Sequence, residues 1–275
     1  MKRIEVQMWI LPKPSLSDAL NDVDEFERLN IIPKTETDPL KALTKLYDTS
    51  SAQVTLSQVN TITSNVAQQI HDAYDETYEN KSLYYIRDDL NKSVVKCPYC
   101  EINECESLDH FFPKSKYKAL ALCRLNLVPM CTKCNGNKAA KNVSGFIHSY
   151  YPDVTLNSKV FFKCSVRVCS CGLSCIFFVA PNVLPKNIEK AVNNQINAVD
   201  LKARLNKAII PFLKTIFITI FSAKALVQGL PRLIAEFENQ PGFYNHWQTA
   251  VLRGLDKKIN GNVAVAQQII DAVKG

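Results

Sequence analysis

Hydrophobic residues recur at steps of three and four over roughly the first 95 residues, and this period places them on one face of an α-helix. A short helix is predicted after Asp38-Pro39, because a capping residue here precedes a proline suited to a first helical turn. A longer helix is predicted from Ser57 to about Glu79, followed by another over Leu83 to Leu90. The apolar stripe of the longer helix consists of Val59, Ile62, Val66, Ile70 and Tyr74. These helices carry no convergent set of polar residues, so residues 1–95 are interpreted as a helical scaffold after an irregular start.

The pattern changes twice further along the chain. Between Cys97 and about Asn142 the helical period is lost and Gly, Pro, Asn and Cys concentrate, which is typical of a small unit held by a metal. Apolar and polar residues then alternate from Lys159 to Ala180, which predicts a β-hairpin with its turn at Cys169 to Gly172. The helical period returns at Lys186 and continues to the end. The expected breaks in this last region are Gly229, Pro231 and Pro241-Gly242.

These patterns together predict an α+β protein that is mainly helical. Its four regions are a helical N-terminal region (1–95), the metal-held unit (96–155), the hairpin (156–182) and a helical C-terminal region (183–275), for which the resemblance described below implies a partner. The most apolar stretch, Ile209 to Ala223, contains Pro211 and Lys214 and is shorter than the roughly 20 residues of a membrane-spanning helix. It is therefore predicted to be a buried helix.

Composition narrows the class further. The 275 residues are 47% hydrophobic and 21% charged, as in an ordinary globular protein. The first residues, Met1 to Val6, show no apolar core with a cleavage site behind it, so no secretory signal is predicted and a cytoplasmic location is expected. Ten cysteines would indicate disulfides in a small secreted protein. In a reducing compartment, paired Cys-x-x-Cys units favour metal ligation instead.

Two Cys-x-x-Cys pairs are the strongest local signal. Cys97-Pro-Tyr-Cys100 and Cys131-Thr-Lys-Cys134 are separated by 30 residues, and a tetrahedral zinc accepts four thiolates from two such knuckles without strain. One pair by itself would equally suit a redox role, but the two together predict a structural zinc. Because a zinc with four cysteine ligands has no open position, it is expected to fold the unit and to take no part in catalysis.

Polar residues of another kind lie within and just after the loop that the knuckles close. Leu108-Asp109-His110-Phe111 precedes Asn126-Leu-Val-Pro-Met-Cys131, and the second knuckle runs into Asn135-Gly-Asn-Lys138. This segment resembles the HNH, or ββα-metal, endonuclease family in its four-cysteine zinc form. The resemblance covers about 45 residues, a sixth of the chain. It implies a small ββα-metal nuclease unit stapled by zinc.

The resemblance also implies a role for each motif residue. Asp109 and Asn135 would bind one divalent cation, and His110, with an ordinary pKa near ~6.5, would be the general base. Asn126 would hydrogen-bond across the loop and hold the segment that carries His110. Two oxygen ligands completed by phosphate and water suit Mg²⁺ or Mn²⁺. Because adjacent strand residues point to opposite faces, we expect a bend or bulge at Asp109-His110.

The net charge of +7 is unevenly distributed. From His110 to Tyr151 there is no acidic residue, whereas the basic ones are Lys114, Lys116, Lys118, Arg124, Lys133, Lys138 and Lys141. A run of like charge is usually a solvated face, but this one surrounds the candidate metal sites and so indicates a polyanionic partner. The lysines predicted to bind nucleic acid are Lys114, Lys116, Lys133, Lys138 and Lys141. Of these, Lys138 is as well suited to facing solvent as to meeting a phosphate.

The remaining cysteines and histidines have structural interpretations. The spacing of Cys164, Cys169, Cys171 and Cys175 lacks two knuckles, so they are interpreted as core and turn residues, with a second metal site as the alternative. Cys105 and Cys123 are interpreted as packing residues. His148 is interpreted as a packed structural histidine, with a cap of the unit or a contact to DNA as the alternatives, and the sequence indicates no partner for His71 or His246.

These residues predict an endonuclease that hydrolyses DNA phosphodiesters, leaving 5′-phosphate and 3′-hydroxyl ends. The layout resembles bacterial anti-phage defence nucleases of the retron and Septu kinds, which implies an ATPase or a reverse transcriptase as partner. A non-catalytic zinc-ribbon subunit that binds nucleic acid or acts as a scaffold is the alternative from another class, and an RNA such as tRNA is the alternative substrate. A binding module would need the lysines but not Asp109, His110 and Asn135 together.

Overall fold

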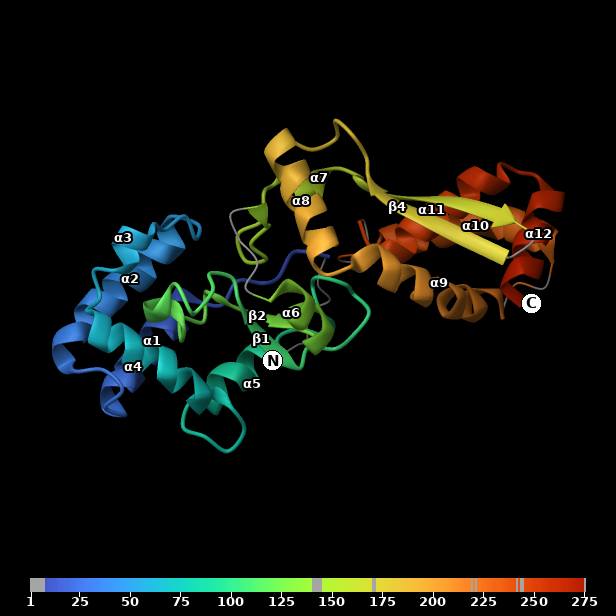
Figure 1. Ribbon diagram of the computed structural model, residues 1–275. Helices are drawn as coiled ribbons and strands as arrows, with labels where there is room; N and C mark the ends of the chain where they lie inside the picture. The colour runs from blue at the N-terminus through green and yellow to red at the C-terminus, as the bar shows by residue number, and fades with distance from the viewer. Residues whose placement is uncertain are drawn as a thin grey trace. The chain divides into compact units, whose positions relative to one another are not determined.

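Residues 8–139, 145–169, 172–218, 220, 222–240, 242 and 245–274 are described by a computed structural model (Figure 1). The chain divides into two units, the first made mainly of residues 9–98 and 104–152 and the second mainly of residues 99–103 and 153–275. Helices dominate both units, and each contains one two-stranded antiparallel sheet. The expected α+β, mainly helical class is confirmed at this level. The finer division into four consecutive regions stays a prediction.

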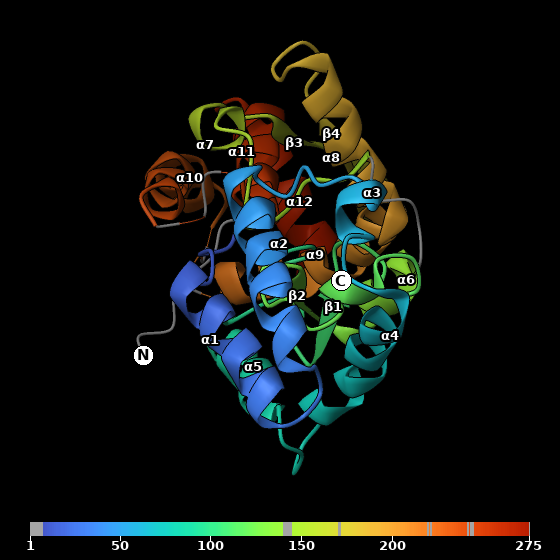
Figure 2. The same cartoon turned by 90° about the vertical axis from the view of Figure 1, so that its left-hand side faces the viewer.

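Helices form most of the N-terminal part of the first unit. Its α-helices are α1 (Leu16–Arg28), α2 (Thr37–Thr49), α3 (Leu56–Val59), α4 (Ser64–Asp72) and α5 (Tyr84–Lys92), and its 3₁₀ turns are Lys34–Glu36, Ala73–Thr77 and Lys118–Leu120. The predicted short helix at Asp38-Pro39 is confirmed as α2, and the one at Leu83 to Leu90 as α5. Helices α1 and α2 pack side by side, as Figure 2 shows.

The predicted long helix from Ser57 to Glu79 is wrong in its continuity. The chain leaves the helix after α3, and Thr61 Oγ1 donates a hydrogen bond to the Gln58 carbonyl at 2.8 Å. Threonine side chains compete in this way for backbone groups that a helix would use, and so they favour helix ends. The apolar stripe listed above is nevertheless buried throughout. The periodicity therefore predicted the buried face correctly and missed the break.

Helix α1 was not predicted, because the start of the chain was interpreted as irregular. Ser15 caps it, with its Oγ accepting a hydrogen bond from the Asp18 backbone N–H at 3.0 Å. The helix buries Val23 and Phe26, but its buried face also includes Asp22, which is 3% exposed. An acidic residue on the buried face interrupts the apolar stripe in the sequence. The hydrophobic pattern alone therefore did not indicate a helix here.

A small sheet and one short helix form the middle of the first unit. Strands β1 (Ser107–His110) and β2 (Leu127–Met130) pair antiparallel in unbroken register from Ser107 opposite Met130 to His110 opposite Leu127. Helix α6 (Thr132–Lys138) follows β2 directly and packs on β1. The bend or bulge expected at Asp109-His110 is absent from this ladder. The two side chains therefore point to opposite faces of the strand, as regular strand geometry requires.

The second unit contains the predicted hairpin. Strand β3 (Phe162–Cys169) pairs with β4 (Gly172–Val179), and the register closes at Cys169 opposite Gly172. Phe162, Cys164 and Val166 are buried, whereas the residues between them are exposed. The alternation thus predicted both the strands and their buried face.

Five helices complete the second unit among the described residues. They are α8 (Lys186–Ala198), α9 (Leu201–Phe217), α10 (Ala223–Glu238), α11 (Trp247–Ile259) and α12 (Val263–Lys274), and the short α7 (Thr155–Ser158) precedes the hairpin. The predicted break at Gly229 and Pro231 is wrong, because both residues lie inside α10. Proline removes one helical hydrogen bond, and burial of Leu226 and Leu230 keeps the helix in place despite that loss. A break does occur at Gly242, between α10 and α11, while Pro241 lies outside the described residues.

The apolar stretch from Ile209 to Ala223 is not one buried helix. Helix α9 ends at Phe217, and Ala223 begins α10. Pro211 lies inside α9, and the buried residues of α9 are spaced along one face, Leu201, Leu205, Ile209, Leu213 and Phe217. In the part of the chain that the structure describes, none of the helices combines the length and the apolar content needed to cross a membrane.

Helix α11 crosses β3 at very close range at Gly254. A Cβ atom added to Gly254 would lie 2.6 Å from the Cys164 carbonyl oxygen, a backbone atom that cannot rotate away. A contact this short forces helix and strand apart. Glycine is therefore required here by packing rather than by backbone conformation.

We predict that Gly254→Ala lowers the free energy of unfolding by about 1–3 kcal/mol, because α11 must move away from β3. The matched control is Gly229→Ala in α10, where a Cβ atom meets nothing within 4 Å. That change is expected to raise stability by about 0.5–1 kcal/mol through the helix propensity of alanine. Chemical denaturation of the two variants measures both effects, and equal shifts would contradict the packing argument.

Candidate functional site

The two cysteine knuckles converge. The ligand sulfurs of Cys97, Cys100, Cys131 and Cys134 all lie within 4.8 Å of one another, and all four residues are buried. None of the four is in a disulfide. Four buried thiols at this spacing are the donor set of a tetrahedral zinc site, so the residues fit the ion that the spacing predicted.

Local hydrogen bonds shape each knuckle. Cys131 is the N-cap of α6, and its Sγ accepts a hydrogen bond from the Cys134 backbone N–H at 3.4 Å. In the other pair, Arg204 of α9 donates from Nη2 to the Cys100 Sγ at 3.4 Å. A guanidinium beside a ligand sulfur favours the thiolate form that binds metal. Sequence reasoning missed Arg204, because nothing in its neighbourhood indicates a metal site.

Asp109 lies on β1 and its carboxylate faces α6. The side chain is 4% exposed, and its Oδ2 lies 2.8 Å from the Nζ of Lys138. Burial raises the pKa of Asp109 to about 6, and the lysine acts in the opposite direction. Lys138 is the one polar partner of this carboxylate among the described residues, so the carboxylate retains capacity for a second cation.

Lys138 occupies a different environment from the one its sequence suggested. It is 1% exposed and its ammonium donates to the His110 carbonyl at 3.3 Å in addition to pairing with Asp109. A buried lysine requires such partners, because an unpaired buried charge is costly. Any contact between Lys138 and a phosphate would therefore form inside the site, not on the surface, and stays a prediction.

His110 points to the opposite side of β1, toward the loop that joins the strands. Its Nε2 lies 2.9 Å from the Ala121 carbonyl oxygen, which can only accept, so Nε2 carries the proton and Nδ1 is left with its lone pair. Burial lowers the pKa of His110 to about 3, which keeps the ring neutral. The Tyr74 ring packs 4.5 Å from the imidazole.

Asn135 lies in α6 and faces β1. Its Nδ2 donates to Ser107 Oγ at 3.1 Å and lies 3.5 Å from the Leu108 carbonyl. Asn135 and Lys138 are one helical turn apart, and both reach the same strand. Asp109 and Asn135 thus lie on facing elements, which is what a shared cation requires. That they share one stays a prediction.

Asn126 ties together the loop between β1 and β2. It is fully buried; its Oδ1 accepts from the Phe112 backbone N–H at 2.8 Å, and its Nδ2 donates to the carbonyls of Phe112 at 3.2 Å and Leu120 at 3.1 Å. All of these partners lie between His110 and Asn126 itself. The side chain therefore holds the segment that follows the candidate base.

A buried chain of hydrogen bonds continues from Asn126 into the N-terminal helices. Tyr47 of α2 donates its hydroxyl to Asn126 Oδ1 at 3.1 Å and lies 2.9 Å from His148 Nε2. The Tyr150 backbone N–H donates to His148 Nδ1, so Nε2 carries the proton and donates to Tyr47. Burial lowers the pKa of His148 to about 3, in agreement with a neutral ring. His148 is thus packed inside the first unit.

The basic run has several structural roles. Arg124 is buried and pairs with Asp22 of α1 at 2.7 Å, and Lys118 donates to Gln68 of α4. Lys116 and Lys133 are exposed, and Lys114 is partly exposed with its Nζ 4.4 Å from the centre of the Tyr74 ring. Lys141 lies outside the described residues. The positive surface charge near the site thus comes from fewer residues than the basic stretch of the sequence indicated.

The hairpin cysteines form no second cluster in the described part of the chain. Cys164 and Cys175 are buried, as expected of core residues, and Cys169 closes the hairpin. Cys169 is disulfide-bonded, which leaves it no thiolate for a metal, and Cys171 lies outside the described residues. Cys105 and Cys123 are partly buried and lie outside the four-cysteine cluster. Burial raises the pKa of the Cys123 thiol to about 12, which makes it inert.

One comparison with known proteins is informative. A stretch of 54 residues is 41% identical to the Septu protein PtuB of Bacillus thuringiensis. The stretch covers 18% of this chain and 21% of PtuB, so the likeness extends to about a fifth of that protein's length. No protein-family model matches the chain, and no solved structure is similar to it.

We predict that the purified chain carries about one zinc ion and that its removal by a chelator lowers the melting temperature, since the ion closes the cysteine cluster. Cys134→Ser is expected to lose the zinc, whereas Cys123→Ser, at a free thiol outside the cluster, retains it. Metal analysis and thermal unfolding measure both. A chain free of zinc that melts unchanged in chelator would contradict the prediction.

We predict that Asn126→Ala destabilises the chain by roughly 3–5 kcal/mol, because it leaves several buried polar groups without a partner at once. Asn103→Ala, at an exposed asparagine, is expected to change stability by less than about 0.5 kcal/mol. Urea denaturation compares them. Similar small effects would show that the Asn126 hydrogen bonds do not hold the loop.

Proposed function

We propose that this chain is a metal-dependent endonuclease of the HNH, or ββα-metal, type that hydrolyses DNA phosphodiesters. One observation carries the proposal. Strand β1 presents a buried carboxylate toward α6 and, on its next residue, a neutral imidazole whose proton is held by a backbone carbonyl. A structural cysteine cluster stands at the start of the same helix. A zinc-binding scaffold by itself needs no such pair of groups.

The two oxygen-bearing residues are the proposed ligands of a divalent cation. Asp109 and Asn135 would hold Mg²⁺ or Mn²⁺, hard ions that accept oxygen ligands and keep several waters. When bound, the cation would neutralise charge on the phosphate and the leaving oxygen. The zinc cluster would stabilise the fold only.

His110 is the proposed general base. With its Nε2 proton donated to the Ala121 carbonyl, Nδ1 is the nitrogen that accepts a proton from water. The water oxygen then bonds to phosphorus as the bond to the 3′ oxygen breaks, and the 3′ oxygen takes up a proton from solvent water, which leaves a 5′ phosphate and a 3′ hydroxyl. The low pKa of His110 keeps Nδ1 unprotonated before substrate binds.

Lys138 is proposed to keep the Asp109 carboxylate ionised while no cation is bound. Burial raises the pKa of Asp109, and the ammonium at 2.8 Å opposes that effect. The candidate ligand is thus held in its metal-binding form by a residue of the same helix as Asn135. On this proposal a neutral side chain at position 138 weakens the site through Asp109.

The similarity to PtuB supports a role in a bacterial anti-phage defence system of the Septu kind. We propose on this basis that the chain acts with a protein partner such as an ATPase, or a reverse transcriptase if the system is of the retron kind. Isolation of the chain from its native cells, followed by identification of the bound proteins, would test the partner separately from the chemistry.

The nuclease proposal predicts cleavage of plasmid or single-stranded DNA in Mg²⁺ or Mn²⁺ and none in chelator. His110→Ala is expected to lower the rate by about 10²–10⁴-fold, because general-base catalysis contributes on that order. His71→Ala, at a histidine paired with Asp72, serves as the matched control and is expected to cleave normally.

Zinc content and melting temperature of both histidine variants must equal those of the wild type. A loss of activity can then be assigned to the missing base and not to misfolding. Equal cleavage rates for wild type and His110→Ala would contradict the nuclease proposal. A parallel digestion of total RNA distinguishes the substrates: cleavage of RNA with intact DNA would retain the nuclease class and change its target.

A further inference from the structure

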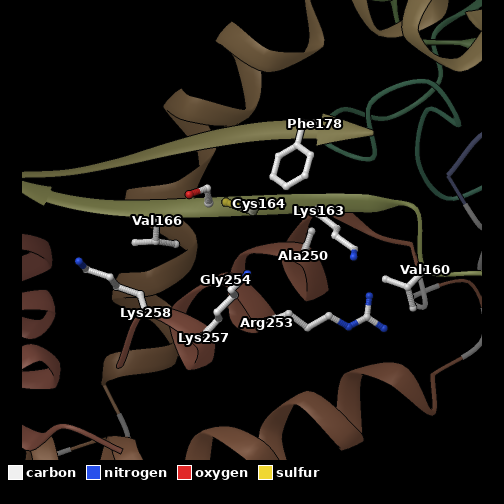
Figure 3. A pocket seen from close by; sticks show the side chains of 11 residues that line it. Val160, Lys163, Cys164, Val166, Phe178, Ala250, Arg253, Gly254, Lys257 and Lys258 are labelled. Atoms are coloured by element: carbon white, nitrogen blue, oxygen red, sulfur yellow. The ribbon is translucent and has the colours of Figure 1, made fainter. Parts of the chain in front are cut away.

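A pocket of about 450 Å³ lies in the second unit between β3 and α11 (Figure 3). Four consecutive β3 residues, 163–166, contribute to its lining. Neighbouring strand residues point to opposite faces, so four in succession can line one pocket only where it follows the edge of the strand. The volume is within the range of small-molecule sites.

Positive charge dominates the polar part of the lining. Lys163 of β3 and Arg253, Lys257 and Lys258 of α11 line the pocket, and no carboxylate does. Figure 3 shows Lys163 and Arg253 approaching the same space from opposite walls. The C-terminal end of a helix favours lysines, which accounts for Lys257 and Lys258 but not for Lys163 on the facing strand.

Most of this charge is not neutralised within the described residues. Arg253 pairs with Glu238 of α10 at 2.7 Å. Lys163, Lys257 and Lys258 are exposed, and no carboxylate in the described part of the chain lies within ion-pair distance of them. Cations that converge on one space without counter-charges attract an anion.

Apart from Ser165, the rest of the lining is mainly apolar. Val160, Phe178 and Ala250 line the pocket together with the lysines, and the Phe178 ring is partly exposed. An inorganic anion would use the charges and leave this surface unused. A ligand with a phosphate and an aromatic or sugar body matches both parts, because bases stack on aromatic rings and phosphates pair with lysine.

We propose that this pocket binds a nucleotide through its phosphate, either as a free nucleotide or as one unit of a nucleic-acid strand. The site is distinct from the candidate nuclease centre, since every residue that lines it lies in β3, β4 or α11, except Val160, which lies two residues before β3. It requires no divalent cation and no cleavage.

The test uses the full zinc-loaded chain with His110→Ala, so that a strand is not cut, and no added divalent cation. The probes are a fluorescent ATP analogue and a fluorescein-labelled twelve-nucleotide thymidine strand, followed by anisotropy at low salt. Lys163→Glu with Lys257→Glu is expected to weaken binding of at least one probe by about 10–100-fold, and its salt dependence should decrease.

The matched control is Lys186→Glu with Lys190→Glu, the same charge change on exposed lysines of α8 that do not line the pocket. It is expected to retain affinity within about threefold, since long-range charge is screened. Melting temperature and zinc content of both double variants check the fold. Loss of the ATP analogue in the pocket variant identifies a free nucleotide, and loss of the strand alone identifies nucleic acid.

The proposal is overturned if neither probe binds, or if the two double variants weaken binding equally. Because binding is measured with the candidate base removed, failure here leaves the nuclease proposal untouched. Conversely, an inactive wild type that still binds a probe through Lys163 and Lys257 would support the pocket without the nuclease.

Discussion

The convergence of four buried thiols is the constraint on which the candidate site depends. The two knuckles bracket 30 residues, and the second knuckle is also the start of α6. A loop whose two ends are joined has fewer conformations in the unfolded chain, so it loses less conformational entropy on folding. With its first turn held by the cluster, α6 is placed over β1, where Asn135 contacts Ser107 and Lys138 contacts Asp109. The short strands and the seven-residue helix would have little stability of their own without that closure.

Buried polar groups then determine the detail of the site. The Asp109–Lys138 pair lies inside the unit, and a buried charge is tolerated there only with a partner. Asn126 and His110 each attach their side chains to carbonyls of the loop between the strands. Networks of this kind are strong when complete and costly when one member is lost. The geometry of the site therefore depends more on hydrogen bonds and ion pairs between buried polar groups than on hydrophobic packing.

The N-terminal helices do more than cover this site. Tyr47 of α2 reaches Asn126, Asp22 of α1 pairs with Arg124, and the Tyr74 ring packs against His110. The first two contacts join a helix to the segment between β1 and β2, and the third joins a 3₁₀ turn to the end of β1. Residues 1–95, interpreted as a helical scaffold, thus hold the loop with polar as well as apolar side chains. The residues that follow His110 are thus held both by side-chain packing and by hydrogen bonds from these helices.

Short-range patterns were enough to predict the cysteine cluster, the β3–β4 hairpin, and helices α2 and α5. Each of these depends on the spacing of cysteines, on the alternation of apolar residues or on a helix cap, and all three signals lie within a few residues of the chain. The burial of Lys138 and the partners of His110 and Arg124 were not predictable in this way. Asp22 and Arg124 are 102 residues apart in the chain, and no local pattern links them. The break after α3 and the continuity of α10 through Pro231 also depended on competing side-chain bonds and burial. The sequence by itself determined which residue types carry the candidate chemistry, whereas only tertiary packing decided their protonation, exposure and partners, because these depend on groups that the fold brings together from distant positions.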